Sequence, residues 1–482
     1  MNLVDLNINF AAVLPEIGLT VLAIIVLILD LFMHKDKKRV LGFVSVLGLL
    51  ALLPVVFMTV YSAPSFGGMV ISDLYSAFFN TIFIIAAIFT ILISSKYLTK
   101  MEMHRGEYYY ITLFATIGMM VMASSNDFIS LYVGLELMAL SFYVLVALRF
   151  DSTRSIEGAL KYFVLGALSS GILLYGISFV YGITGTTNLA EMAIELSDVS
   201  TRNSFLFLGI AMIIVGFAFK IAVFPFHVWA PDTYEGAPTP VTALLSVGSK
   251  AAAFAVFLRV FIVAFPAFQP EWSKLLWILS AATMLFGSVV AISQKNIIRM
   301  LAYSSIAHAG IILIGLLSYN EMGLAGIMYY LLVYVFMNMG VFAVVIFLVR
   351  KDGKWEHISD YKGLATRSPL TAFLMALFLV SLAGIPPTGG FLAKFYIFAS
   401  AISARYYWLA VIGAIATVIS LFFYARVIFY MYMKEPDGFD SSLPQTSELI
   451  VLFCAAIGTI FLGVYPAPFI DMAIKAVRPL LM

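Results

Sequence analysis

The sequence predicts an all-α polytopic membrane protein with about fourteen transmembrane helices, and three observations carry that prediction. Hydrophobic residues make up 62% of the 482-residue chain, and charged residues make up only 11%. The mean hydropathy is +1.03, which excludes an ordinary soluble domain. The apolar residues also recur in runs of about twenty, the helix length that spans a ~30 Å hydrocarbon core.

The apolar runs define the expected helices and divide the chain into four regions. We expect an N-terminal three-helix segment at 1–106, a first repeat at 107–264, a second repeat at 272–432, and a C-terminal loop with the last helix at 433–482. The expected spans are 12–33, 39–61, 73–96, 107–124, 127–148, 155–182, 203–228, 239–264, 272–293, 297–317, 321–349, 369–400, 405–432 and 446–465.

The distribution of basic residues over the loops predicts the orientation. One alternating set of loops contains 17 Lys and Arg residues, whereas the opposite set, with the C-terminal tail, contains 5. Cytoplasmic loops are the ones enriched in Lys and Arg. We therefore expect both termini on the outer side of the membrane and the polar turn from Ala230 to Pro240 on the inner side.

The seventh expected helix carries a lysine and a proline deep within its apolar run. Lys220 lies in FAFKIAVFPFHVWAPDTYEGAP, five residues before Pro225, and His227 follows. Proline removes a backbone donor and interrupts a helix. A helix interrupted at membrane depth is tolerated where it lines a cavity or packs within protein. The eighth helix then carries Lys250 into the membrane, and buried ammonium groups of this kind predict a functional site.

The twelfth expected helix shows the same combination. In VSLAGIPPTGGFLAKFYIF the apolar run is interrupted at Pro386 and Pro387, and Lys394 follows closely. Two interrupted helices at corresponding places in two halves are typical of transporters built from inverted repeats. We expect helices 4–8 and 9–13 to form two inverted five-helix repeats, with helices 7 and 12 broken.

A carboxylate in the fifth helix completes the predicted relay. Glu136 lies about nine residues inside its span, which places it ~14 Å deep at 1.5 Å per residue. A buried carboxylate stays ionised beside a lysine, so we pair Glu136 with Lys220. Lysine releases a proton when such a carboxylate moves away, whereas arginine stays charged. Lysine at 220, 250 and 394 is therefore what proton transfer requires.

Two histidines and three further basic residues have less certain roles in the sequence. His308 falls near the middle of its span and could pass a proton between its ring nitrogens, or could be a hydrogen-bonded core residue. His227 either serves the inner entrance or caps the turn. Lys161, one helical turn after Glu157, is either an interfacial ion pair or an inner relay group. Arg259 and Arg426 are interpreted as structural or snorkelling side chains.

Composition also narrows the chemistry. The single cysteine, Cys454, excludes an intrachain disulfide and thiolate-ligated iron–sulfur clusters. The sequence contains no phosphate-binding loop and no dinucleotide fingerprint, and no basic tract indicates nucleic acid. We expect no redox cofactor and no metal site in this chain.

Four separated motifs, in order, resemble one known family. LPEIGLTVLAIIVLILDLF, LYVGLELMALSFYVLVAL, KIAVFPFHVWAPDTYEGAPTPV and LAGIPPTGGFLAKFYIF are similar to the N subunits of proton-pumping NADH–quinone oxidoreductase, respiratory complex I. The resemblance extends from about Leu14 to Tyr432. It implies fourteen helices with two inverted repeats, and relay residues that match Glu136, Lys220, Lys250 and Lys394, with suggested roles for Lys161, His227 and His308.

The same resemblance implies the biochemical setting. Partner subunits would carry FMN, iron–sulfur clusters and quinone, and would oxidise NADH and reduce quinone; this chain would act as the proton-translocating translocase subunit. Its expected partners are other membrane and peripheral subunits of complex I, including the antiporter-like subunit M, together with the lipid bilayer, protons and water. The expected location is the inner (plasma) membrane of a bacterium.

Two alternatives remain open at this point. The chain could be a subunit of a cation/proton antiporter without redox chemistry, although sodium sites favour carboxylate and carbonyl oxygens over lysine. It could also be a structural membrane subunit that anchors partner proteins. The complex I subunit and the antiporter both require the buried lysines to change protonation, whereas the structural subunit does not.

Overall fold

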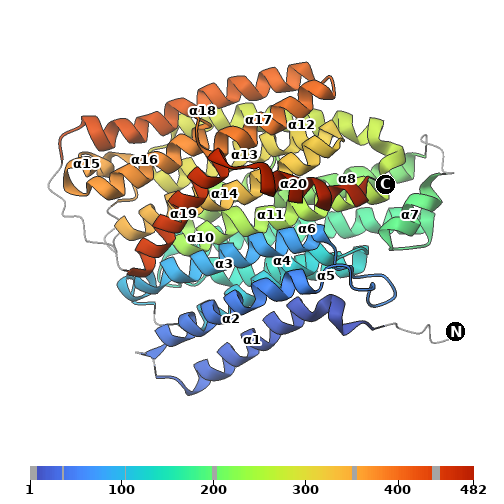
Figure 1. The fold of residues 1–482 in the computed structure, drawn as a ribbon, viewed down its shortest axis with the longest axis horizontal. Coiled ribbons are helices and arrows are strands. Elements are labelled where there is room, and N and C mark those ends of the chain that lie inside the picture. The colour runs from blue at the N-terminus through green and yellow to red at the C-terminus, as the bar shows by residue number, and fades with distance from the viewer. Residues whose placement is uncertain are drawn as a thin grey trace.

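The computed structural model describes residues 8–34, 37–103, 105–197, 203–349, 355–436 and 446–481. Several basic residues used in the orientation argument (Lys35, Arg202, Arg350, Lys351 and Lys354) lie outside these ranges, as does most of the loop predicted after residue 433. The described chain contains helices and no strand longer than an isolated bridge. Most helices run along one common axis, which is horizontal in Figure 1.

The α-helices follow one another in the order that the apolar runs predict. They are α1 (Leu14–Phe32), α2 (Arg39–Met58), α3 (Leu74–Lys100), α4 (Glu107–Ser124), α5 (Phe128–Val146), α6 (Thr153–Thr184), α7 (Leu189–Ser197), α8 (Ser204–Lys220), α9 (Trp229–Gly236), α10 (Thr239–Leu244), α11 (Lys250–Arg259), α12 (Gln269–Ser293), α13 (Ile297–Ser318), α14 (Glu321–Leu348), α15 (Leu364–Arg367), α16 (Pro369–Ala383), α17 (Gly389–Ser403), α18 (Tyr407–Met433), α19 (Thr446–Val464) and α20 (Ala467–Val477).

The predicted fold class, all-α and polytopic, is confirmed. Eleven helices among the described residues are long and apolar enough to cross a membrane, and α8, α16 and α17 are shorter apolar helices. Each of the fourteen predicted spans contains helix when α4 and α8 are included and α16–α17 counts as one interrupted span. Helix α9 lies beyond the predicted end at 228, where the sequence analysis expected a polar turn, and α7, α15 and α20 also lie outside the predicted spans. The number that crosses the bilayer, and the inverted repeats, stay predictions.

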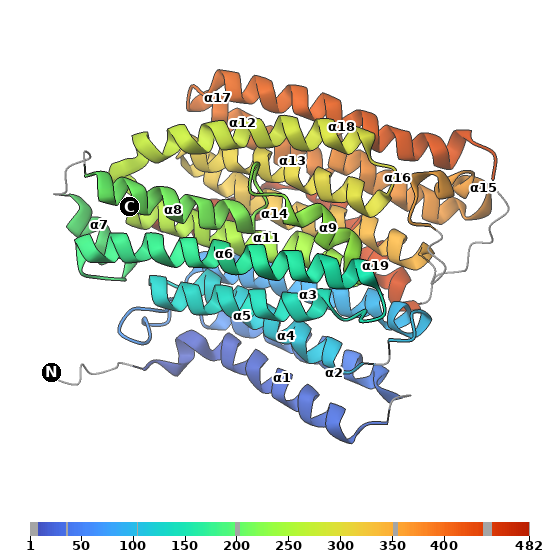
Figure 2. The same ribbon diagram turned by 180° about the vertical axis from the view of Figure 1, so that it is seen from behind.

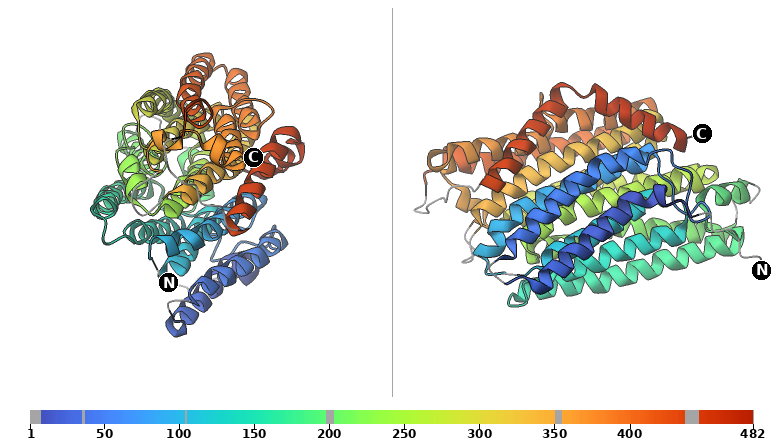
Figure 3. Two further views of the ribbon diagram at one scale, coloured as in Figure 1. Left: turned by 90° about the vertical axis from the view of Figure 1, so that its left-hand side faces the viewer. Right: turned by 60° about the horizontal axis from the view of Figure 1, so that its bottom comes forward.

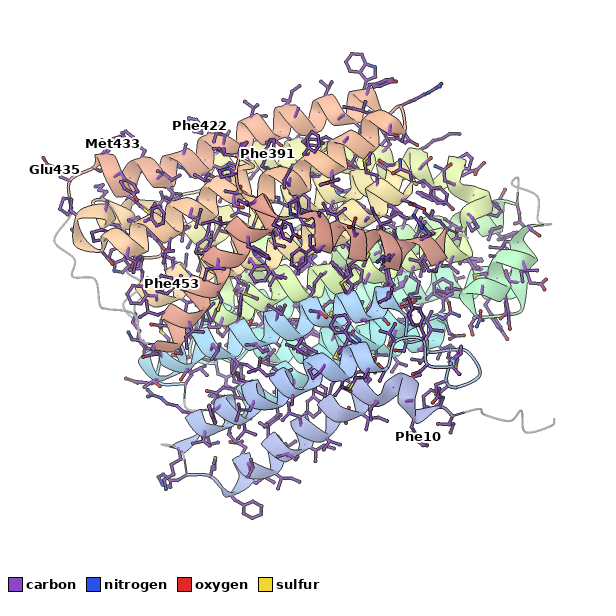
Figure 4. The ribbon with its side chains drawn as sticks, in the orientation of Figure 1. Phe10, Phe391, Phe422, Met433, Glu435 and Phe453 are labelled. Carbon is purple, nitrogen blue, oxygen red and sulfur yellow. The ribbon has the colours of Figure 1, made fainter. Side chains whose placement is uncertain are left out.

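Burial separates a central group of helices from a peripheral one. In α13 and α14, 94% of the apolar window is buried within the protein, against 39% in α1, α2 and α18. Large apolar side chains such as Phe10, Phe422, Met433 and Phe453 project outward from the bundle (Figure 4). An apolar exterior around a packed interior is what a hydrocarbon solvent favours.

The first two helices form a layer at one edge of the bundle, as the end-on view shows (Figure 3). Helix α3, by contrast, is 83% buried and packs against α14 and α10. The predicted N-terminal three-helix segment is therefore continuous with the rest of the core through its third helix. The start of α1 and the end of α20 lie toward the same side of the bundle, opposite α15 (Figure 1).

The seventh predicted span is interrupted between α8 and α9, with Pro225 in the connection. Ala222 has a positive φ of 58° there, a conformation that costs a non-glycine residue about 1–2 kcal/mol. The indole of Trp229 donates to the carbonyl of Phe219 at 3.0 Å and so satisfies a group at the end of α8. Figure 2 shows α9 displaced from α8 toward the end of the bundle that holds α15.

The twelfth predicted span is interrupted between α16 and α17, and Pro386 and Pro387 lie in the connection. Gly384 ends α16 with a φ of 83°, the left-handed conformation in which glycine commonly terminates helices. At Gly390 an added Cβ would lie 1.9 Å from the carbonyl oxygen of Ser381. Glycine is therefore required where α17 starts close against α16.

The eighth predicted span, which is a different element from α8, is a continuous but irregular helix. The π turns η3 (Leu245–Ser249) and η4 (Val260–Ala264) flank α11, so α10, η3, α11 and η4 form one helix from Thr239 to Ala264. The first π turn ends directly before Lys250. Single π turns within α-helices are frequent at functional sites.

The C-terminal region contains one element that the sequence analysis did not predict. The last predicted span corresponds to α19, and Pro466 then separates it from an amphipathic helix, α20, whose residues Ile470, Ala473, Ala476 and Val477 are buried. Proline ends one helix and is favoured at the start of the next. Helix α20 packs along α14 and α3 and so closes the bundle on that side.

Candidate functional site

Three lysines lie inside the membrane-spanning bundle. Lys220, Lys250 and Lys394 are each at most 4% exposed, and they come from the end of α8, the start of α11 and the middle of α17. A charged amine in such surroundings requires polar partners or a change of protonation. The partners differ at each lysine.

Lys220 has no hydrogen-bond partner for its buried Nζ among the described residues. The carboxylate of Glu136 on α5 lies within electrostatic range, and its Oε1 is also buried without a hydrogen-bond partner in that part of the chain. No ion pair within 4.0 Å joins the two groups in the described chain. The predicted pair is therefore a charge-to-charge proximity and not a direct contact.

His227, which the sequence left between an entrance and a cap, lies in the connection after α8 among aromatic rings. Its ring centroid is 4.6 Å from that of Phe286 and 5.5 Å from that of Phe224. Its Nδ1 is buried without a hydrogen-bond partner among the described residues, so it does not cap the turn through that nitrogen. An apolar cavity of about 250 Å³ lies beside the same connection, lined by residues that include Pro225 and Trp229.

Lys250 is bound to helix α13. Its Nζ donates to the carbonyl of Ser305 at 2.6 Å and also contacts the hydroxyl of the same serine. The side chain of Lys250 leaves the backbone at the first residue of α11, immediately after the π turn η3. Lys250 is therefore linked by hydrogen bonds to the helix that carries His308.

His308 makes a hydrogen bond through each ring nitrogen. Nδ1 lies 2.5 Å from the hydroxyl of Tyr330 on α14, and Nε2 lies 3.1 Å from the hydroxyl of Tyr424 on α18. The Tyr424 hydroxyl also contacts the hydroxyl of Ser304. Lys394 and Lys250 are close enough to act electrostatically on the ring.

Lys394 lies under the interruption of helix twelve. Its Nζ donates to the carbonyls of Leu382 and Ala383 at 2.9 and 3.1 Å. These carbonyls belong to the last turn of α16, where helical carbonyls have no intrahelical partner and the helix dipole favours a cation. Lys394 therefore acts as a side-chain cap of α16 from the neighbouring half of the broken helix.

Lys161 lies in a charged cluster at the end of the bundle that the orientation argument places inside. Its Nζ is 2.7 Å from Glu157 and 2.7 Å from Asp232, and Arg299 on α13 contacts Asp232 at 2.7 Å and Glu235 at 3.0 Å. Burial raises the pKa of Asp232, but hydrogen bonds from Lys161 and Arg299 outweigh it and hold that pKa below its usual value. The ion-pair interpretation of Lys161 is thus present in the structure.

The charged cluster ties the first interruption to the second half of the chain. Asp232 and Glu235 belong to α9, whereas Arg299 opens α13 and Arg154 opens α6. A cavity of about 160 Å³ lies among these side chains and Glu157. Protonatable carboxylates around a surface cavity can collect protons from solution, so this cluster is also a candidate entrance.

Arg259 and Arg426 have structural environments. Arg259 forms a bidentate pair with Asp73 at 2.9 and 3.1 Å and donates to the carbonyl of Ala123. Arg426 donates to the carbonyls of Ile292 and Gln294 at the end of α12. Both side chains join helices distant in sequence.

The structure thus brings Lys250, His308 and Lys394 into one neighbourhood, and it leaves His227 at the first interruption and Lys161 in the charged cluster. Sequence analysis did not single out Tyr330 or Tyr424. Ser304 and Ser305 precede His308 by about one helical turn in the sequence, but no sequence pattern shows which tyrosine of another helix reaches the ring.

Two interrupted helices, buried lysines and a buried histidine in an all-helical bundle define the class of antiporter-like membrane subunits. Residues 125–420 match the family described as NADH:quinone oxidoreductase/Mrp antiporter, transmembrane region. The chain is 44% identical to NADH-quinone oxidoreductase subunit N of Trichlorobacter lovleyi, over 98% of each chain. It is 43% identical to the subunit N of Desulforamulus reducens, over 98% of this chain and 99% of that one.

The structure agrees with these sequence relationships. It is similar to a chain of respiratory complex I from Thermus thermophilus, with a TM-score of 0.80 and 28% identity, over 95% of this chain and 98% of that one. The chain belongs to the family of NADH-quinone oxidoreductase N subunits.

Proposed function

We propose that this chain translocates protons as the N subunit of a bacterial NADH–quinone oxidoreductase. The proposal is carried by three buried lysines, each in a different polar environment, and by the buried His308, on which the charges of Lys250 and Lys394 act. Family membership supplies the reaction that would drive transfer, namely NADH oxidation and quinone reduction in partner subunits.

The residue types support proton movement over ion binding. A lysine can exchange a proton when its electrostatic surroundings change, whereas an arginine keeps its charge. Glu136 is placed to provide that change for Lys220, because the two groups interact through space without a contact that would lock them. A movement of either side chain would therefore alter the protonation of Lys220 at low structural cost.

The proposed path has an inner part and an outer part. Protons would reach Lys220 and Lys250 from the inner side, past the charged cluster of Lys161 and Asp232 and the His227 region. They would then pass through Ser305 and His308 toward Lys394. Water would bridge the gap between Glu136 and Lys220, since their separation exceeds a direct contact.

The same proposal sets the partners and the location. FMN, iron–sulfur clusters and quinone would belong to other subunits of the complex, and subunit M would be one of the membrane neighbours. Both termini would lie on the outer side of the bacterial inner membrane. The cation/proton antiporter remains the alternative, because the matched family description names both kinds of protein.

The test is proton pumping by the complete complex reconstituted in lipid vesicles. Lys250→Ala should lower pumping at least about tenfold, because a positioned acid–base group typically contributes 10²–10⁴-fold to a proton-transfer step. Lys274→Ala is the matched control, since Lys274 is exposed on α12, and it should pump normally. Normal pumping by Lys250→Ala contradicts the proposal. Purification of the chain with cation-transport subunits, and without flavin and iron–sulfur subunits, supports the antiporter.

A further inference from the structure

The imidazole of His308 is held between two phenol hydroxyls from different helices. Tyr330 on α14 occupies Nδ1 and Tyr424 on α18 occupies Nε2, and Ser304 occupies the far side of the Tyr424 hydroxyl. We propose that the Tyr424 and Tyr330 hydroxyls are proton-transfer groups on the two sides of His308, and that Tyr424 receives the proton from Ser304. This inference rests on the proposed function and names further relay residues in it.

The partners of these hydroxyls distinguish them from structural tyrosines in the same bundle. Tyr329, adjacent to Tyr330 on α14, donates to the backbone carbonyl of Leu462, and Tyr75 donates to the backbone carbonyl of Ala255. A hydroxyl bound to a backbone carbonyl has reached a group that cannot take its proton. Tyr330 and Tyr424 instead face an imidazole, which accepts and releases protons near neutrality.

Burial restricts how the hydroxyls can act. Tyr330, Tyr424, Ser304 and His308 are all buried, with His308 2% exposed. A charged phenolate would be costly in apolar surroundings. Each hydroxyl can therefore relay a proton only by receiving one as it gives one, so the tyrosines stay neutral before and after each transfer.

The transfer then balances as follows. Ser304 gives its hydroxyl proton to the oxygen of Tyr424 and receives another from a water molecule on its other side, while the Tyr424 O–H proton passes to Nε2 of His308, which leaves an imidazolium. The imidazolium gives the proton on Nδ1 to the oxygen of Tyr330, while the Tyr330 O–H proton passes to a water molecule beyond it. The ring ends neutral in the other tautomer, and each hydroxyl again holds one proton. One proton enters, one leaves, and no electron moves.

The position of this group in the bundle gives the transfer a direction. Ser304 and Ser305 are adjacent on α13, and Ser305 holds the ammonium of Lys250. Lys394 acts electrostatically on the same ring. The tyrosine–histidine group is therefore linked through neighbouring serines of α13 to Lys250 and lies within electrostatic range of Lys394.

The experiment replaces each hydroxyl and leaves the ring. In the complete reconstituted complex, Tyr330→Phe and Tyr424→Phe should each lower proton pumping at least about fivefold, a smaller loss than the 10²–10⁴-fold that a positioned acid–base group typically contributes. Tyr329→Phe is the matched control because it removes a buried hydroxyl from the same helix without touching His308, and it should pump normally. Normal pumping by both Tyr330→Phe and Tyr424→Phe overturns the inference.

A second measurement separates proton transfer from simple positioning of the ring. Replacing Tyr424 by 2,3-difluorotyrosine keeps the hydroxyl and its hydrogen bonds but makes the phenol more acidic. A transfer role predicts a changed pumping rate and a changed solvent isotope effect, whereas a positioning role predicts neither. A rate and an isotope effect equal to those of the natural residue overturn the transfer role.

The failure of this inference can be told apart from failure of the proposed function. If His308→Ala and Lys250→Ala abolish pumping while both phenylalanine variants pump normally, the lysine–histidine relay stands and the tyrosines are excluded from it. If His308→Ala and Lys250→Ala also pump normally, the proposed function itself is wrong. Adding Tyr424→Phe to His308→Ala should cause no further loss, because the two residues act in one step.

Discussion

The two interrupted helices place a lysine in opposite ways. At the first interruption the end of α8 is satisfied by the indole of Trp229, and Lys220 is left without a hydrogen-bond partner among the described residues. At the second, Lys394 itself binds the last carbonyls of α16. The first lysine is therefore sensitive to a distant carboxylate, whereas the second is sensitive to the geometry of its own helix interruption.

The two turns differ in the same sense. Ala222 adopts a positive φ at the first interruption, whereas Gly384 adopts one at the second. A side chain in that conformation carries strain that glycine avoids. The first interruption thus combines backbone strain with an ammonium that has no hydrogen-bond partner among the described residues. The second combines a glycine turn with an ammonium that is hydrogen-bonded to the end of α16. We infer that the first half of the chain is the one more easily switched.

The largest effect is expected when the electrostatic interaction between Glu136 and Lys220 at the first interruption is removed. Glu136→Gln or Lys220→Ala should lower proton pumping at least about tenfold, because the carboxylate can no longer change the protonation of the lysine, and acid–base groups contribute 10²–10⁴-fold. Pumping in vesicles checks the result, with Lys274→Ala as the control. Unaltered pumping by both variants would mean that Lys220 and Glu136 are not functionally paired.

A smaller effect is expected at the second interruption. Lys394→Arg keeps a donor for the carbonyls of Leu382 and Ala383 but cannot release a proton. Pumping should fall about fivefold or more on the acid–base scale, whereas amide hydrogen exchange in 380–390 should change little. Faster exchange together with lost pumping would indicate that the variant disrupts the α16 cap, and normal pumping would make Lys394 a positional residue only.

The turns themselves should respond in opposite directions. Gly384→Ala should destabilise the second interruption by about 1–2 kcal/mol, because a side chain is strained at positive φ and its Cβ would lie 2.9 Å from Cδ of Lys394. Ala222→Gly should relieve about 1 kcal/mol at the first. Amide hydrogen exchange around each turn in the purified complex measures both changes in local stability. If the two variants changed the exchange rates equally and in the same direction, the two turns would not differ in strain.

The smallest expected effect concerns the charged cluster that connects α9 to α13. The pKa of Asp232 is lower in the folded protein than its unfolded value of about 3.8. The ionised carboxylate therefore stabilises the folded protein fully above that unfolded pKa, and this stabilisation is lost only as the pH falls through the lower folded pKa. Asp232→Asn should therefore cost about 0.2–1 kcal/mol, as for exposed ion pairs. The cost should be constant from about pH 8 to about pH 5.

Thermal stability of the purified complex at both pH values measures this difference between Asp232→Asn and the unaltered chain. A difference that shrinks between pH 7 and pH 5 would show that the carboxylate titrates within that range. Such a result would make Asp232 a proton-collecting group at the entrance and not only an ion-pair partner of Lys161 and Arg299.

The features that depend on neighbours along the chain could be predicted from the sequence. Apolar runs gave the spans, proline gave the two interruptions, and counting residues from the surface gave the depth of Glu136. These inferences need only the rise of a helix and the cost of a charge in hydrocarbon. The breaks and the burial of the lysines in the structure follow the same rules.

The features that depend on packing could not be predicted. The partner of Arg259 is Asp73, 186 residues away, and the partner of Lys161 besides Glu157 is Asp232, 71 residues away. Tyr424 reaches His308 from another helix. Helix periodicity shows which face of a helix is buried but not which distant helix lies against it, so these contacts are absent from any local pattern.

The π turn before Lys250 has a consequence for comparing sequences of this family. A turn closed from residue i to i+5 accommodates one residue more than a regular α-turn, and each residue rotates a side chain by roughly 100° around the axis. A homologue that lacks one residue among 245–249 could keep its lysine in register with Ser305 by closing a regular turn. An alignment gap at this place would then signify preserved geometry.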